Sequence, residues 1–133
     1  MAGYHAPNAY QEVQVLGSDP RRLVVMLCQA LTRYLVRAHN AIERRDYEAK
    51  SQALILAEQV LSELICSLDP DVGGDLAEKL RGLYAHLQLQ LVDVDLQDDL
   101  DRLRYVIEIA EKLRDAWEEA AGKCQSEHGQ NAA

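Results

Sequence analysis

The chain has 133 residues, 20 leucines, no phenylalanine and a formal net charge of −8 at pH 7. This length suits a single domain, residues 1–133, whose core needs neither disulfide nor metal. The acidic charge disfavours nucleic acid and anionic membrane surfaces as partners. No stretch reaches the roughly 20 apolar residues of a membrane span, and the N-terminus lacks the basic patch and apolar run of a signal peptide. We therefore expect a cytosolic protein without membrane insertion.

The N-terminal 20 residues predict a short helix followed by the start of a long one. Residues 1–8 are mostly small or polar, and we expect them to be disordered. Residues 9–16 have the length of two helical turns, and their larger apolar side chains are Tyr10, Val13 and Leu16. Gly17 ends this element, and Ser18-Asp19-Pro20 supplies capping residues followed by a proline in the first helical turn.

Two long helices follow, separated by a short charged break. The first is predicted by apolar residues in steps of three and four, at positions 23, 27, 30, 31, 34, 38, 41 and 42. Residues 43–46 contain no apolar side chain, and Asp46 can cap the next helix. That helix carries its stripe at positions 53, 57, 60, 61, 64 and 68. Because the break is short, the two helices should lie antiparallel.

The segment 68–77 interrupts the pattern with Pro70 and the pair Gly73-Gly74. We expect the third long helix to begin after the glycine pair, because Asp75 and Glu78 resemble a capping box. Its stripe runs through positions 76, 80, 83, 84, 87, 91 and 94. Asp98 and Asp99 then supply anionic caps for a fourth helix, with apolar residues at 100, 103, 106, 107, 110, 113 and 117.

These elements predict an antiparallel up-down four-helix bundle with a short extra N-terminal helix. Beyond Ala121 the residues are small and polar, so we expect residues 122–133 to be a disordered tail.

The sequence offers no catalytic or cofactor chemistry, and we expect a non-enzyme without metal or cofactor. A di-metal bundle needs Glu-x-x-His pairs, yet none of the four histidines has a glutamate three residues before it. The acidic run 93–101 lacks the glycine and the terminal glutamate of a calcium loop. Asp71 and Asp75 flank the glycine pair and would repel a phosphate. The three cysteines have no zinc spacing.

Apolar residues exceed what a bundle core needs, which is about three in seven per helix. The surplus is Val24, Val25, Leu35, Leu54, Ile55, Leu56, Leu89 and Val92. Either these residues broaden the core, or they offer an apolar groove to a partner helix. Composition leaves both readings open.

An ordered set of short segments runs through the chain. It consists of Tyr10 and Val13, residues 18–23, Met26-Leu27, residues 33–35, Ile65, residues 67–69, residues 73–77, Leu80, Leu83-Tyr84, Leu91 and residues 113–117. In order and spacing this set resembles the flagellar secretion chaperone FliS family over residues 9–118. Cys28-Gln29-Ala30 and Ala85-His86 depart from the family pattern.

The resemblance implies an export chaperone that binds the disordered C-terminal segment of flagellin in apolar grooves, which prevents premature polymerisation and keeps flagellin competent for type III secretion. It also implies that residues 9–16 cover part of the groove in the free protein. The candidate partner-binding residues are Tyr10, Val13, Leu16, Leu23, Val24, Leu27, Leu31, Tyr34, Leu83, Leu87 and Leu91. Other flagellar export or regulatory proteins are further candidate partners. The alternatives are a structural bundle that self-associates, for example as a homodimer, and a helical-bundle enzyme.

Overall fold

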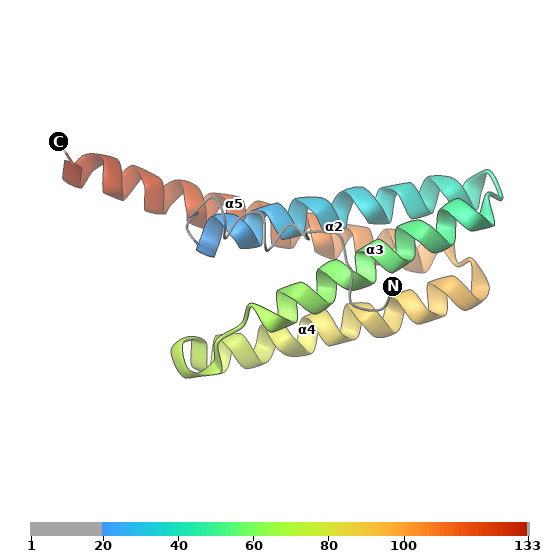
Figure 1. The fold of residues 1–133 in the computed structure, drawn as a ribbon, viewed down its shortest axis with the longest axis horizontal. Coiled ribbons are helices and arrows are strands. Elements are labelled where there is room, and N and C mark those ends of the chain that lie inside the picture. The colour runs from blue at the N-terminus through green and yellow to red at the C-terminus, as the bar shows by residue number, and fades with distance from the viewer. Residues whose placement is uncertain (1–19, 133) are drawn as a thin grey trace, which may run out of the picture.

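The computed structural model describes the backbone of residues 20–132 and the side chains of residues 20–123. Four helices occupy this part of the chain: α2 (Pro20–Glu43), α3 (Tyr47–Cys66), α4 (Pro70–Gln97) and α5 (Leu100–Ala132). Successive helices run antiparallel (Figure 1). Both α2 and α4 pack against α3 and α5, so α2 and α4 stand diagonally across the bundle. The predicted all-α bundle is confirmed, whereas the predicted helix at 9–16 lies outside the described residues.

Aspartates cap the two turns at one end of the bundle. The Asp46 carboxylate accepts a hydrogen bond from the backbone N–H of Ala49, 3.1 Å away, at the start of α3. Asp98 adopts a left-handed conformation, with φ of 52°, that ends α4. The Asp99 carboxylate then accepts from the N–H of Arg102 at 3.0 Å and begins α5. These caps satisfy helix-end groups that would otherwise lack partners, which makes the turns tight and the helices antiparallel.

The start of α4 contains one more helical turn than the sequence predicts. The helix begins at Pro70, where Asp69 is the N-cap and accepts from the N–H of Asp71 at 3.0 Å. Proline is well tolerated in a first helical turn, so one turn forms before the glycine pair. Gly74, with φ of 52° and ψ of −127°, then interrupts the helix. The long part of α4 thus follows the glycine pair, as the sequence predicts, and the added finding is the short helical turn from Pro70 that precedes the kink at Gly74.

The core lies between the inward stripes of the four helices. Its largest fully buried side chains are Tyr84, Leu27, Leu31, Leu35, Leu61, Leu64, Leu87, Leu91, Leu103, Val94 and Val106. These positions follow the three-and-four spacing seen in the sequence, as expected for amphipathic helices that bury one face. The described residues therefore form a buried core of their own.

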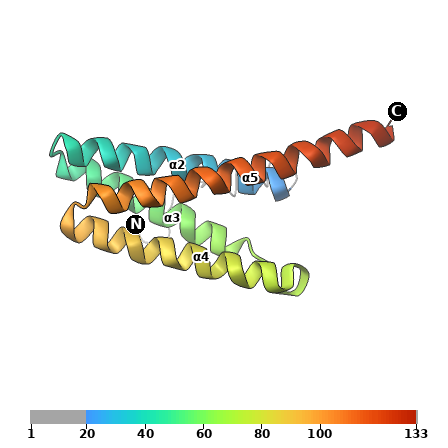
Figure 2. The same ribbon diagram turned by 180° about the vertical axis from the view of Figure 1, so that it is seen from behind.

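The C-terminal end of α5 extends past the rest of the bundle, as both views show (Figure 2). The sequence predicts a tail from residue 122, and in the structure the helix continues to Ala132. No proline interrupts this stretch, and the Lys123 ammonium forms an ion pair with the Glu119 carboxylate at 3.1 Å across Gly122. Such i,i+4 pairs stabilise a helix by a few tenths of a kcal/mol.

Candidate partner-binding surface

The predicted partner-binding residues fall into three groups. Tyr10, Val13 and Leu16 lie outside the described residues. Five others are core residues with at most 5% of their surface exposed: Leu23, Leu27, Leu31, Leu87 and Leu91. Val24, Tyr34 and Leu83 are half-buried. In the observed packing the five core leucines belong to the cluster shared by the helices of the bundle. They can meet a partner only if the helices separate.

The apolar surplus divides between the core and the surface. Val25, Leu35 and Leu54 are buried and broaden the core. Ile55, Leu89 and Val92 instead expose 57%, 67% and 52% of their surface, and Leu96, which the sequence analysis did not single out, exposes 77%. The first reading therefore holds for Val25, Leu35 and Leu54, and the exposed subset stays a candidate surface for a partner helix.

Leu89, Val92 and Leu96 are exposed on α4, and Ile55 is exposed on the neighbouring helix α3. Leu89, Val92 and Leu96 follow steps of three and four, which place them on one stripe of α4. Two polar contacts join this side of α4 to α3. At one end the Lys50 ammonium donates to the Asp98 carboxylate at 2.6 Å and to the Asp95 carbonyl at 3.1 Å.

At the other end of this side, the Gln88 amide donates to the Ser62 hydroxyl at 3.2 Å. Ile55 of α3 and Val92 of α4 lie between the two contacts in sequence. Since the helices are antiparallel, these residues lie at a similar level along the bundle. We call the surface formed by Ile55, Leu89, Val92 and Leu96 the α3–α4 face.

Lys50 joins α3 to the end of α4 at one edge of this face. Only 7% of the residue is exposed, and its ammonium also lies 3.3 Å from the Asp95 carboxylate. The hydrogen bond to Asp98 raises the pKa of Lys50, while burial acts in the opposite direction. The ammonium also lies at the C-terminal end of α4, where backbone carbonyls carry partial negative charge. This buried lysine is thus fully paired, and it fixes α3 against the end of α4.

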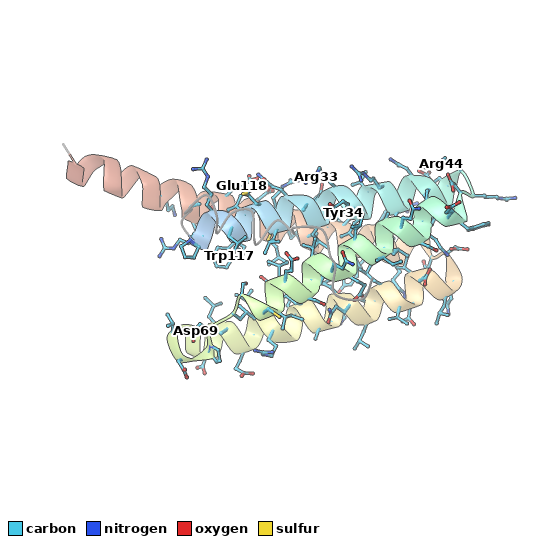
Figure 3. The ribbon with its side chains drawn as sticks, viewed as in Figure 1. Arg33, Tyr34, Arg44, Asp69, Trp117 and Glu118 are labelled. Atoms are coloured by element: carbon cyan, nitrogen blue, oxygen red, sulfur yellow. The ribbon has the colours of Figure 1, made fainter. Side chains whose placement is uncertain are left out.

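The opposite face of the bundle, between α2 and α5, carries charged side chains of both signs. It contains a depression of about 630 Å³ lined by Gln29, Thr32, Arg33, Val36, Arg37, Arg114, Asp115 and Glu118. The Arg114 guanidinium pairs with Asp115 at 3.0 Å, and the Gln29 amide donates to Glu118 at 3.0 Å. Figure 3 labels Arg33 and Glu118, which mark the α2 and α5 sides of this region. We call this the α2–α5 face, and its charged side chains distinguish it from the aliphatic α3–α4 face.

Cys28 and Tyr84 are buried ionisable side chains, and neither has the lowered pKa of an activated catalytic group. Burial, with the nearby Glu118 charge, raises the pKa of the Cys28 thiol to about 12. Burial likewise raises the pKa of Tyr84, and a hydrogen bond from the Trp117 side chain partly offsets that effect. A thiol held protonated is a weak nucleophile. Within residues 20–123, no cluster of three His, Cys, Asp or Glu side chains is arranged to hold a metal ion.

None of the helices in the described part of the chain combines the length and apolar character required to cross a membrane. An all-helical bundle with an apolar strip exposed on its surface has the features of a protein–protein interaction module.

The model of the family described as "Flagellar protein FliS" matches residues 3–124. The flagellar secretion chaperone FliS of Campylobacter jejuni is 34% identical over 115 residues, covering 86% of this chain and 89% of the relative. Those of Bacillus subtilis and Salmonella typhimurium are each 29% identical, covering 90% and 87% of this chain and 89% and 90% of the relatives.

The chain belongs to the FliS family, which confirms the resemblance identified from the sequence. Membership supports a role as a flagellar export chaperone with a partner in flagellar export. The relatives are named as chaperones and not as enzymes, in agreement with the prediction of a non-enzyme.

Proposed function

We propose that this chain is a cytosolic, single-domain export chaperone that binds the disordered C-terminal segment of flagellin. In this proposal the bound segment forms amphipathic helices against the bundle. Flagellin is thereby kept from premature polymerisation and remains competent for flagellar type III secretion. The observation that carries the proposal is the α3–α4 face, where four large aliphatic side chains are exposed outside the buried core.

The energetics of such a surface suit a reversible partner. Covering the exposed parts of Ile55, Leu89, Val92 and Leu96 contributes about 1 kcal/mol per side chain. An unfolded segment must also be ordered when it binds, which offsets part of that gain. The balance favours binding that holds flagellin yet permits its release to the export machinery.

The partner-binding residues predicted from the sequence have three different roles in this proposal. Val24, Tyr34 and Leu83 are half-buried and able to contact a partner on the α2 side and on α4. Tyr10, Val13 and Leu16 are proposed to belong to the segment that covers apolar surface in the free protein. The five buried leucines support the surface from below.

Titration of the full chain with a flagellin C-terminal peptide tests the proposal. We expect binding at micromolar concentration or tighter, followed by calorimetry, with a gain of helix in circular dichroism. Leu89→Glu on the α3–α4 face should weaken binding at least about tenfold, because it places a charge in an apolar contact. Val36→Glu, the matched change on the α2–α5 face, should leave affinity within about twofold. Absence of binding by the wild type, or equal loss in both variants, would contradict the proposal.

Self-association through the same face is the alternative function. It predicts a concentration-dependent mass for the chain alone, which Leu89→Glu would reduce. Sedimentation with and without the flagellin peptide separates the two functions, since a chaperone forms a mixed complex whereas a self-associating bundle does not.

A further inference from the structure

The outer side of α2 carries positive charge on an acidic protein. This helix contains four arginines and one glutamate, although the whole chain has a net charge of −8. The glutamate, Glu43, lies at the C-terminal end of the helix and contacts His39 at 3.2 Å. Steps of three and four place three of the arginines on one side of α2, with two exposed apolar residues between them and no acid. We call this set the α2 stripe: Arg22, Met26, Gln29, Arg33, Val36, Arg37 and Asn40.

The arginines of the α2 stripe have no carboxylate partner among the described residues. No hydrogen bond or ion pair joins Arg22 or Arg33 to another residue in this part of the chain, and Figure 3 shows Arg33 on the side of α2 away from α4. The Arg37 guanidinium lies over the Tyr34 ring, 5.4 Å from its centroid. That contact orients the guanidinium and leaves its N–H groups available to an acceptor.

The acids nearest to the α2 stripe are engaged by other groups. Asp115 and Glu118 of α5 lie across the depression of the α2–α5 face. Asp115 pairs with Arg114 at 3.0 Å, and Glu118 accepts a hydrogen bond from Gln29 at 3.0 Å. Glu111 also lies near Arg114. The acids of α5 thus cluster around an arginine of their own helix, and the charge of the α2 stripe remains uncompensated.

We propose that the α2 stripe is a second docking surface, which binds an acidic amphipathic segment of a partner protein. Carboxylates of that segment pair with Arg33 and Arg37, and its apolar residues cover Met26 and Val36. The proposal goes beyond flagellin binding and does not depend on it. Because α2 and α4 stand diagonally across the bundle, the α2 stripe and the α3–α4 face can be occupied at the same time.

Charge complementarity identifies the kind of partner. A guanidinium group binds a carboxylate through two parallel N–H···O bonds, which are stronger than bonds between neutral groups. Arg33 and Arg37 are one helical turn apart, so two carboxylates one turn apart on a partner helix match them. Met26 and Val36 expose 37% and 41% of their surface and add apolar contact. A nucleic acid is a poorer match, because a long polyanion would also meet the many acids around the stripe.

The test uses two synthetic amphipathic helical peptides that differ only in having glutamates or glutamines beside their leucines. The glutamate peptide should bind the wild type about tenfold more tightly than the glutamine peptide at low salt. Added salt should reduce this preference, because it screens charge pairs at the surface. The net charge of −8 acts against the expected result, since it repels an acidic peptide. Equal binding of the two peptides, or tighter binding of the glutamine peptide, would overturn the proposal.

Substitutions in the α2 stripe locate the binding. Arg33→Gln combined with Arg37→Gln should abolish the preference for the glutamate peptide. The matched control, Lys79→Gln combined with Arg81→Gln, removes two exposed charges from α4 and should keep the preference within about twofold. All four residues are exposed, so the midpoint of urea unfolding should stay the same. Arg33→Glu combined with Arg37→Glu should favour a lysine version of the peptide, and a glutamate preference that survives this reversal contradicts the proposal.

Two single variants distinguish this surface from the α3–α4 face. Val36→Glu should abolish the preference for the glutamate peptide and leave the affinity for a flagellin C-terminal peptide within about twofold. Leu89→Glu should do the opposite. Displacement of the glutamate peptide by the flagellin peptide would overturn the proposal, because the two would then share one site. Tighter binding of a single-stranded RNA of similar length would also overturn it, by identifying nucleic acid as the ligand.

The outcomes for the two proposals are independent. If the flagellin peptide binds and the preference for glutamate is absent, the acidic-segment proposal is overturned and the chaperone proposal stands. If the preference is present and the flagellin peptide does not bind, only the chaperone proposal fails.

Discussion

The inner and outer faces of α4 contain the same kinds of apolar residue but differ in their exposure to solvent. On the inner face Leu87, Leu91 and Val94 expose at most 2% of their surface. On the outer face Leu89 and Leu96 expose 67% and 77%. The difference is whether another helix of the chain reaches the residue: α3 and α5 cover the inner stripe, and no described helix covers the outer one. An apolar side chain is thus more stable when it is buried, but its presence in the sequence does not show whether folding or binding buries it.

Neighbouring leucines of α4 should therefore affect different measured quantities. Inner residues should determine the free energy of unfolding, whereas outer residues should determine affinity for a partner. Substitutions that act on only one of the two quantities are the means to test the distinction.

The largest expected effect is that of Leu87→Ala on the inner face. Leu87 is fully buried, so truncation loses transfer free energy and leaves a cavity, and we expect a loss of about 2–5 kcal/mol in urea unfolding. Leu89→Ala, two residues away, should change stability by less than about 0.5 kcal/mol. Similar losses in the two variants would mean that both faces contribute to the fold, and the comparison would fail.

A smaller effect is expected at Gly74, whose kink precedes the longer part of α4. Its φ of 52° is strained for any residue with a side chain, although no atom would clash with an added Cβ. Gly74→Ala should therefore cost about 1–3 kcal/mol. Gly82→Ala is the control, because Gly82 is exposed within the helix and also has space around it.

Gly82→Ala should raise stability by about 0.5–1 kcal/mol through helix propensity. Thermal or urea unfolding measures both changes. If Gly74→Ala is also stabilising, the kink is not an obligatory feature, and the orientation of the two faces of α4 does not depend on it.

The smallest effect on stability is expected from the polar group on the inner face of α4, the Tyr84 hydroxyl. Tyr84→Phe removes the hydroxyl that receives the hydrogen bond from Trp117, and we expect a loss of about 1 kcal/mol at neutral pH. Burial raises the pKa of Tyr84 in the folded state. As pH rises past the ordinary tyrosine pKa of about 10, the unfolded chain therefore loses this proton first, and the folded state loses stability.

The Tyr84→Phe variant does not lose stability through this titration. The difference in free energy of unfolding between the wild type and Tyr84→Phe should therefore narrow as pH rises from about 9 to about 12. Cys28, whose pKa is raised to about 12, should cause an alkaline decline in both proteins. A gap that widens with pH would contradict the assignment of the raised pKa to Tyr84. Urea unfolding at several pH values provides the measurement.

Much of the fold could be read from the sequence because its signals are local. Periodic leucines predicted the four helices, and the cap at Asp46 and the start at Pro20 lie where expected. The helical turn at Pro70 before the glycine pair and the helical backbone of α5 beyond residue 122 did not follow from the sequence, since a capped proline turn and a helix without a stop signal compete closely with irregular backbone.

The candidate surface was harder to predict. Lys50 has the appearance of an ordinary polar position, because its partners lie 45 and 48 residues away in the chain. Leu96 gave no distinctive signal, since a single exposed leucine on a helix is common. Only the packing of α3 against α4 brings these residues to one surface.

The sequence by itself determined that this chain folds as antiparallel amphipathic helices and that it belongs to the FliS family, because helix periodicity, caps and motif order are properties of the chain alone. The tertiary structure decided which leucines form the core and which remain on the surface. Burial depends on which helices meet and at what rotation, and this follows from packing between segments far apart in sequence.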